Sequence, residues 1–254
     1  MNPEIFTFGA IRLPVYPTFM VIAFIIGWTI GYFDAEKQGL NPIRALEAGI
    51  VSNFAGVVGA RILYVILQWD NFMAYPEYIF LFRLTGLSFM GGLIGAFIGT
   101  FLWSRWRRES FFKFTDLFAV YWALGYGIVR IGCFFGGCCF GKVTDLPWAV
   151  TMVRVDDLPR HPVQLYATLL AFTGVLILLM LRRIRPFDGF ITLSAFATYG
   201  ILRFTTEFFR EGELFWMGLT DAQLASAALF AVSTAAIIIT YYTISSKKLK
   251  GFTG

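Results

Sequence analysis

The chain has 254 residues, of which 57% are hydrophobic and 15% are charged, and its mean hydropathy is +0.68. A soluble domain carries about 25% charged and about 45–50% apolar residues, so the composition excludes a soluble protein and indicates an integral membrane protein with short loops. The net charge of +5 does not indicate a nucleic-acid partner, because Lys and Arg in membrane proteins mark the cytoplasmic loops. The first residues lack the basic region and cleavage site of a signal peptide, so we expect the first apolar segment to stay in the mature protein.

Seven segments are apolar and long enough to be candidate spans, since a spanning helix needs about 20 mostly apolar residues. None has the alternation of a membrane strand, so we expect helices. In chain order the segments are 16–33, 48–67, 86–103, 116–131, 163–181, 187–204 and 222–242. We therefore predict an all-α polytopic membrane protein with one domain, residues 1–254, in which the fourth helix is the shortest and is interrupted by glycines.

Basic residues predict the orientation of these helices. Four clusters fall on one side of the predicted topology and hold 12 of the 21 Lys and Arg residues. They are Lys37 with Arg44; Arg105, Arg107, Arg108 and Lys113; Arg182, Arg183 and Arg185; and Lys247, Lys248 and Lys250. Because such clusters stay in the cytoplasm, we expect the N-terminus outside, the C-terminus inside, and the loop after residue 131 at the outer face.

Glycines recur at a spacing that suits close helix packing. Gly56 and Gly59 are separated by two valines, and Gly91, Gly92 and Gly95 follow in the third candidate span. Small residues at such a spacing let membrane helices approach closely. We favour this packing interpretation over close approach of the backbone to a ligand.

Four arginines lie within apolar segments or at their outer edges: Arg61, Arg83, Arg130 and Arg203. A charge inside a bilayer is costly and normally faces a partner or a wet cavity. Arg203, Glu207 and Arg210 form an i, i+4, i+7 stripe, which alone could be a local ion pair. The arginines nevertheless outnumber the carboxylates expected near them, and a surplus of guanidinium groups suggests an anionic ligand such as a lipid phosphate.

The segment 127–141, with sequence GIVRIGCFFGGCCFG, holds all three cysteines of the chain, Cys133, Cys138 and Cys139. Three functional interpretations remain open beside simple packing: a disulfide, which an outer face permits; a zinc site with His161 as fourth ligand, although the spacing is unusual; and a reactive thiol activated by Arg130. His161, the only histidine, opens the run His-Pro-Val-Gln-Leu-Tyr, which is typical of a helix start. It is either a hydrogen-bonded structural residue or a base.

Motifs along the chain, in order, resemble the prolipoprotein diacylglyceryl transferase family. The matching pieces are Tyr16, Gly59-Ala-Arg-Ile-Leu-Tyr64, Gly86-Leu-Ser-Phe-Met-Gly-Gly-Leu-Ile-Gly95, Arg130-Ile-Gly132, His161-Pro-Val-Gln-Leu-Tyr166 and the run from Tyr199 to Arg210. The resemblance implies seven spans and an inner-membrane enzyme that moves a diacylglyceryl group from phosphatidylglycerol to a lipobox cysteine thiol of a prolipoprotein. It implies that Arg130 and Arg203 hold the lipid phosphate and that Glu207 orients Arg203.

The resemblance also shows departures. Met90, Cys133, Cys138 and Ala167 stand where the family has His, Asn, Glu and Glu. The residues suited to a phosphate therefore remain, whereas several polar residues near the acceptor thiol do not. Two alternatives stay open: a paralogue that modifies a phospholipid with another acceptor, and a non-enzymatic membrane protein that binds thiols or metals.

The sequence thus predicts a phospholipid-dependent transferase of a bacterial cytoplasmic membrane, with its active site toward the outer face. Its expected partners are a phosphatidylglycerol-like lipid and the signal-peptide region of a prolipoprotein, and we assign no cofactor and no metal. The expected catalytic residues are Arg130, Arg203, Glu207, Cys133 and Cys138. The expected substrate-binding residues are Tyr16, Arg61, His161, Gln164, Tyr166, Tyr199 and Arg210.

Overall fold

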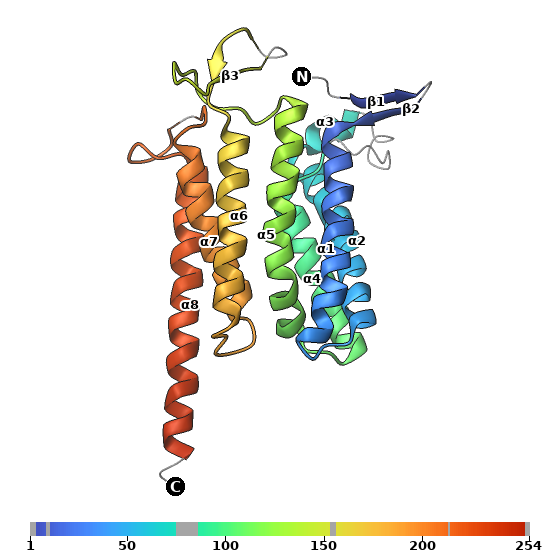
Figure 1. Cartoon of the computed structure of the whole chain (residues 1–254), viewed down its shortest axis with the longest axis vertical. Helices are drawn as coiled ribbons and strands as arrows, with labels where there is room; N and C mark the ends of the chain where they lie inside the picture. Colours follow the sequence, from blue (N-terminus) through green and yellow to red (C-terminus); the bar gives the residue numbers. More distant parts are fainter. Residues whose placement is uncertain (1–3, 9–10, 75–85, 153–155, 213, 252–254) are drawn as a thin grey trace. The chain divides into compact units, whose positions relative to one another are not determined.

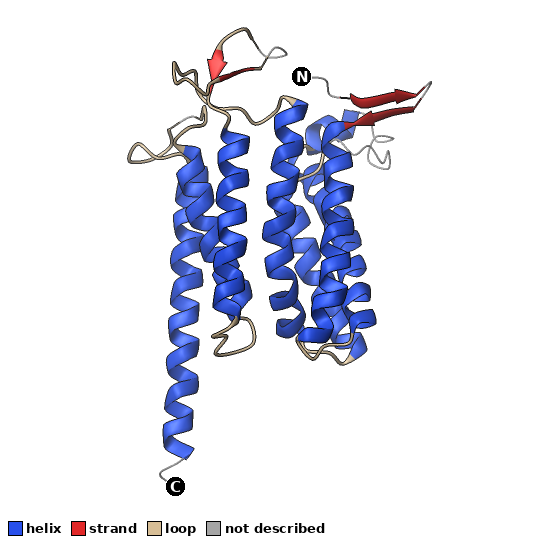
Figure 2. Ribbon diagram, in the orientation of Figure 1, coloured by secondary structure: helices blue, strands red, loops and turns tan. Residues whose placement is uncertain are grey.

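The computed structural model describes residues 4–8, 11–74, 86–152, 156–212 and 214–251. Helices dominate this part of the chain (Figures 1 and 2). Arg83, one of the arginines noted in the sequence, lies outside the described residues. The chain divides into two compact units, residues 28–115 and residues 1–27 together with 116–254.

Five of the described helices are long and apolar enough to cross a membrane: α1 (Val15–Lys37), α2 (Pro42–Leu67), α5 (Phe111–Gly136), α6 (Val163–Arg182) and α8 (Asp221–Gly251). Two further helices, α4 (Phe89–Arg107) and α7 (Phe190–Glu207), coincide with the other two candidate spans of the sequence. The chain is therefore a multi-pass, all-helical membrane protein. The short helix α3 (Trp69–Ala74) was not predicted.

The fourth predicted span differs most from the structure. Helix α5 has 26 residues and begins five residues before the predicted start. Gly125, Gly127 and Gly132 do not interrupt it, because they lie where neighbouring helices pack. A Cβ at Gly127 would lie 2.6 Å from Phe172, and one at Gly132 would lie 2.7 Å from Phe19. The glycines therefore let α6 and α1 approach α5 instead of breaking it.

The unit of residues 28–115 is built on the contact between α2 and α4. Helix α2 begins after Asn41, whose side chain accepts hydrogen bonds from the amides of Ile43 and Arg44, as expected of an N-cap. A Cβ placed on Gly59 would lie 2.5 Å from the carbonyl oxygen of Gly91 and 2.8 Å from the Cα of Gly95. The two backbones therefore touch, and the packing interpretation of these glycines is confirmed.

In the other unit, α6, α7 and α8 lie side by side (Figure 1). Asp116 on α5 is 1% exposed. It accepts hydrogen bonds from the amides of Gly189 and Thr192 and from the Thr192 hydroxyl. These amides lie at the first turn of α7, where an anionic acceptor satisfies free donors and the helix dipole. Asp116 thus fixes the start of α7 against α5.

Two short hairpins belong to the same unit and were not predicted. Strand β1 (Glu4–Phe8) pairs antiparallel with β2 (Ile11–Pro14), directly before α1. Strand β3 (Val150–Thr151) pairs with β4 (Pro159–Arg160) in the long connection between α5 and α6. Figure 2 shows this connection, in tan and red, next to the N-terminal end of α6.

Candidate functional site

The end of helix α5 brings two of the predicted site cysteines together. The amide of Cys138 donates a hydrogen bond to the carbonyl of Cys133 at 3.1 Å. The amide of Gly137 donates one to the carbonyl of Phe134 at 3.2 Å. Gly137 has φ +69°. This pair of bonds with a left-handed glycine between them is a Schellman motif, in which the side chains at the positions of Cys133 and Cys138 commonly touch. The Gly-Gly-Cys sequence therefore produces the pairing.

Cys139 completes a cluster of three thiols. The Sγ atoms of Cys133, Cys138 and Cys139 all lie within 4.8 Å of one another. The three are free cysteines, with Cys133 buried and the other two half-buried. Hydrogen bonds from Cys133 and Cys138, helped by the nearby guanidinium groups of Arg130 and Arg210, lower the pKa of the Cys139 thiol.

The predicted arginine stripe forms a buried ion-pair group at the end of α7. Glu207, whose side chain is 7% exposed, lies 2.6 Å from Nη1 of Arg203 and 3.6 Å from Nε of Arg210. Arg130, on α5, has its guanidinium carbon 4.8 Å from the ring centre of Tyr126. Within the described residues Arg130 forms no ion pair with a carboxylate. Glu207 thus pairs with two guanidinium groups, and Arg130 adds a third without a carboxylate partner among the described residues.

These side chains surround one small cavity of about 190 Å³. Its walls come from α5, α6, the end of α7 and the residues just after α5 and α7. The lining residues are Tyr126, Arg130, Cys139, Val163, Gln164, Ala167, Arg203, Thr206 and Arg210. Three of its lining side chains, Arg130, Arg203 and Arg210, carry guanidinium groups. Its charge therefore suits an anionic group such as a phosphate.

An apolar cavity of about 280 Å³ lies between the same helices, and Tyr126 lines both cavities. Tyr199, a predicted substrate-binding residue, borders the apolar cavity together with Trp122 and Leu202. The Tyr126 and Tyr199 ring centres are 5.5 Å apart. The arginine-lined cavity suits the anionic head of a phospholipid, and the apolar cavity suits the start of its acyl chain.

Gln164 connects the thiol segment to helix α6. Its Nε2 donates to the carbonyl of Cys138 at 2.6 Å, and the residue is 1% exposed. Among the described residues, no donor reaches its Oε1. Because Gln164 also lines the cavity of the arginines, this oxygen is a free acceptor suited to a ligand hydroxyl group.

His161 and Tyr166 lie in a separate aromatic group. The His161 Nδ1 atom is 3.2 Å from the Tyr166 hydroxyl, which also accepts a 2.7 Å hydrogen bond from Trp148 Nε1. Phe209 packs against both rings, with centres 5.2 and 5.4 Å away. Neither His161 nor Tyr166 borders the charged cavity, and His161 is not part of the thiol cluster. The structure therefore does not bring His161 to the thiols as a fourth zinc ligand, and the substrate-binding role of both residues stays a prediction.

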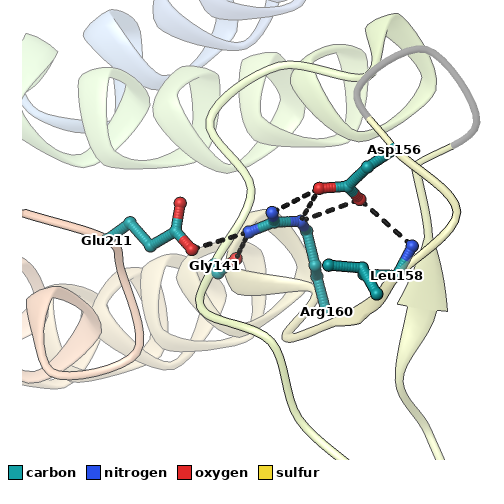
Figure 3. Close-up of polar contacts among 5 residues, drawn as sticks. All are labelled: Gly141, Asp156, Leu158, Arg160 and Glu211. Carbon is teal, nitrogen blue, oxygen red and sulfur yellow. Dashed lines mark hydrogen bonds and ion pairs between the residues drawn. The ribbon is translucent and has the colours of Figure 1, made fainter.

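Arg160, which the sequence analysis missed, holds the loops around this region. The residue is 6% exposed, and its guanidinium donates to Asp156, to Glu211 at 2.9 Å and to the carbonyl of Gly141 at 3.2 Å. Figure 3 shows it between the two carboxylates, which come from different loops. Hydrogen bonds from Arg160 lower the pKa of the Asp156 carboxyl. The i, i+4 spacing of Asp156 and Arg160 was the available signal in the sequence.

The remaining predicted residues lie elsewhere. Tyr16 lies in the first turn of α1 and interacts electrostatically with Arg130 and the three thiols, but it does not line the cavity. Arg61 belongs to the other unit, where its Nη1 donates to the Gly86 carbonyl at 3.2 Å and its guanidinium lies over Phe72. Its place in the site stays a prediction.

Comparison with known proteins identifies the family of this arginine-lined helical chain. A family model described as prolipoprotein diacylglyceryl transferase matches residues 3–239. The chain belongs to the prolipoprotein diacylglyceryl transferase family. The phosphatidylglycerol–prolipoprotein diacylglyceryl transferase of Mannheimia succiniciproducens is 32% identical, over 97% of this chain and 96% of that protein. Proteins of the same name from Vibrio cholerae and Clostridioides difficile are 31% and 30% identical, over 95% and 89% of this chain and 92% and 90% of theirs.

Two residues of this family member came to light only in three dimensions. Tyr126 lies one turn before Arg130, and its ring faces the guanidinium; that spacing was the only signal in the sequence. Cys139 lines the charged cavity and joins the thiol cluster, although only Cys133 and Cys138 were predicted to be catalytic. The left-handed φ of +61° at Cys139, rare for a residue other than glycine, turns the chain there, and no residue pattern predicted this turn.

Proposed function

We propose that this protein transfers a diacylglyceryl group from a phosphatidylglycerol-like phospholipid to the cysteine thiol of a prolipoprotein. The observation that carries the proposal is the position of Arg130, which faces the cavity of Arg203 and Arg210 with no carboxylate paired to it among the described residues. Family membership supports the same reaction, since the relatives are named for it.

In the proposed reaction the acceptor sulfur attacks the glyceryl carbon that carries the phosphate ester. The carbon–sulfur bond forms as the carbon–oxygen bond breaks, and the electron pair leaves with glycerol phosphate. Arg130 and Arg203 hold the phosphate and stabilise the charge that grows on it. Glu207 keeps the Arg203 guanidinium in place. Tyr126 and the apolar cavity beyond it receive the start of an acyl chain.

The same proposal includes the arrangement of the protein in the membrane. It places seven helices across a bacterial cytoplasmic membrane, as one domain of residues 1–254, with the N-terminus outside and the C-terminus in the cytoplasm. The charged cavity then opens toward the outer face, where a translocated signal-peptide region can reach it. The four basic clusters support this orientation, because cytoplasmic loops are enriched in Lys and Arg.

The test is transfer of labelled diacylglyceryl from phosphatidylglycerol to a lipobox peptide by the full-length protein in detergent micelles. We expect the wild-type protein to be active and Arg130→Ala to lose about a hundredfold or more in rate, the equivalent of a few kcal/mol of a charge-assisted phosphate contact. Arg183→Ala removes an exposed arginine outside the cavity and serves as the matched control. Full activity of Arg130→Ala would contradict the proposal.

A different acceptor remains a second candidate, because thiols replace the Asn and Glu expected from the resemblance at Cys133 and Cys138. Expression of this protein in a bacterium depleted of its own diacylglyceryl transferase distinguishes the prolipoprotein acceptor from a different one. Restored lipoprotein maturation supports the main proposal. Turnover of phosphatidylglycerol without peptide modification supports the paralogue, and absence of lipid turnover with thiol or metal binding supports the non-enzymatic alternative.

A further inference from the structure

The three thiols have the arrangement of a metal-binding site that the family resemblance does not account for. Zinc–sulfur bonds of about 2.3 Å in a tetrahedral site place the sulfur atoms about 3.8 Å apart. The Sγ atoms of Cys133, Cys138 and Cys139 all lie within 4.8 Å of one another, so small rotations of the side chains reach that geometry. Thiolates are the ligands that soft and borderline metal ions prefer.

The backbone fixes two of these ligands before any metal binds. Cys133 and Cys138 are the two positions that the Schellman motif at the end of α5 brings together. Gln164 then holds the Cys138 carbonyl from helix α6. A site whose ligands are already assembled loses less conformational freedom on binding.

The charge around the cluster favours a divalent ion. Three thiolates and Zn²⁺ together carry one negative charge, whereas Arg130, Arg203 and Arg210 with Glu207 carry two positive charges, so a positive charge remains for the phosphate. Arg130 interacts electrostatically with Cys133 and Cys139, and Arg210 interacts with Cys139. A monovalent ion such as Cu⁺ would leave two negative charges. The surroundings thus fit Zn²⁺ better.

Three thiols supply three of the four ligands that a zinc ion takes. Zinc takes four ligands, and catalytic zinc sites commonly keep one position for water or substrate. Among the described residues only three side chains form this group, and His161 is not among them. Cys139 also lines the cavity of Arg130 and Arg203. A ligand at the fourth position can therefore approach from the cavity in which the phosphate is proposed to bind.

We propose that Cys133, Cys138 and Cys139 bind a zinc ion whose fourth ligand is the sulfur of the acceptor cysteine. This inference rests on the proposed function for its acceptor, and it adds the metal that the sequence analysis did not assign. Binding to the ion removes the proton of the acceptor thiol, because a coordinated thiol is deprotonated. The sulfur then attacks the glyceryl carbon, glycerol phosphate leaves with the bonding electron pair, and the thiol proton passes to solvent.

The proposed zinc ion also explains how a thiol acceptor can react although this chain lacks several polar residues that the resemblance expects. Met90 and Ala167 remove a histidine and a carboxylate that the resemblance expects, and with them two groups able to take a proton. A metal-bound thiolate needs no side-chain base. The replacement of Asn and Glu by Cys133 and Cys138 is then part of the same change.

Metal content is the first test, on the full-length protein purified in detergent under reductant. We expect about one zinc per chain and an X-ray absorption spectrum with three sulfur neighbours at roughly 2.3 Å. Cys133→Ser, Cys138→Ser and Cys139→Ser should each lose most of the metal. Thr243→Ala, which removes a hydroxyl bonded only to its own helix, is the control and should keep it. The wild-type spectrum decides the site even where a serine variant fails to fold.

The second test adds a lipobox peptide in micelles without phosphatidylglycerol, so that no transfer occurs. The number of sulfur neighbours should rise from three to four with the cysteine peptide and stay at three with its serine analogue. No change with the cysteine peptide would overturn the role of the fourth ligand. Bound copper that does not respond to the peptide would overturn the choice of zinc, and a metal-free disulfide under reductant would overturn the site.

Failure of the two proposals is distinguishable. Coordination of the peptide thiol without any lipid transfer would support the zinc site and contradict the proposed function. Lipid transfer at the wild-type rate by metal-free protein, or by the three serine variants, would support the proposed function and overturn the zinc site.

Discussion

Glu207 lies 2.6 Å from Arg203 in a pocket where its own side chain is 7% exposed, and this one carboxylate also lies 3.6 Å from Arg210. Its charge is therefore divided between two guanidinium groups, while Arg130 on helix α5 lies over the ring of Tyr126. The group as a whole is cationic. Such a group gains most from an anion that reaches all three arginines.

The first prediction separates the position of Arg203 from its charge. Arg203→Lys keeps the charge but cannot form the bidentate contact of a planar guanidinium, so we expect a loss of about tenfold or more in kcat/KM. Glu207→Gln keeps the shape and frees Arg203 from its anchor, and we expect a smaller loss. Both are measured by transfer of labelled lipid to a lipobox peptide. Wild-type activity in Arg203→Lys would rule out the phosphate clamp.

The second prediction concerns the contact of α2 with α4. Gly59→Ala places a methyl group 2.5 Å from the Gly91 carbonyl oxygen, so the helices must separate, and we expect a cost of about 1–3 kcal/mol. Gly92→Ala is the matched control, since its Cβ would lie 3.6 Å from Ala60, an ordinary contact. Thermal unfolding in detergent compares the two. Equal midpoints would show that the backbones are not in contact.

The sequence predicted the helices well because their signal is local. Apolar length alone located α1, α2, α6 and α8, and small residues at a fixed spacing predicted the contact through Gly59. The stripe of Arg203, Glu207 and Arg210 followed from helical periodicity.

The features that could not be predicted depend on contacts between distant segments or on the backbone conformation of the loops. The glycines of α5 were taken as interruptions of the helix, whereas here they admit neighbouring helices, and the helix extends five residues beyond the predicted segment at each end. The role of Arg160 depends on Glu211, which is 51 residues away in the sequence. Cys139 reaches the thiol cluster because its own backbone is left-handed, and nothing in the local sequence predicts that conformation.

The third prediction concerns the stability of the Asp156–Arg160 contact at low pH. Because hydrogen bonds from Arg160 lower the pKa of Asp156, the folded loops bind this proton more weakly than the unfolded chain does. The stabilisation is therefore present above the ordinary aspartate pKa of about 3.9 and is lost as the pH falls through the lowered value. We expect proteolysis of the 142–160 loop by an acid protease to increase in that range, below about pH 4.

Asp156→Asn provides the variant for this experiment. It should make the loop sensitive to proteolysis at neutral pH and remove the dependence on acid. Asp145→Asn, at an exposed carboxylate of the same connection, is the control and should behave as the wild type. An unchanged acid response in Asp156→Asn would show that another group controls the loop.

The last prediction concerns orientation, on which the position of the charged cavity depends. A reporter fused after Lys250 should be active in the cytoplasm, and one inserted near Asp157 should be active outside. The physical reason is that the loops with Lys37, Arg105 and Arg182 resist translocation. Neutralising Arg182, Arg183 and Arg185 together should weaken the preference of that loop without reversing the whole chain, because three other basic clusters still agree. An external reporter at Lys250 would invert the topology and place the cavity at the cytoplasmic face, where a translocated lipobox cysteine could not reach it.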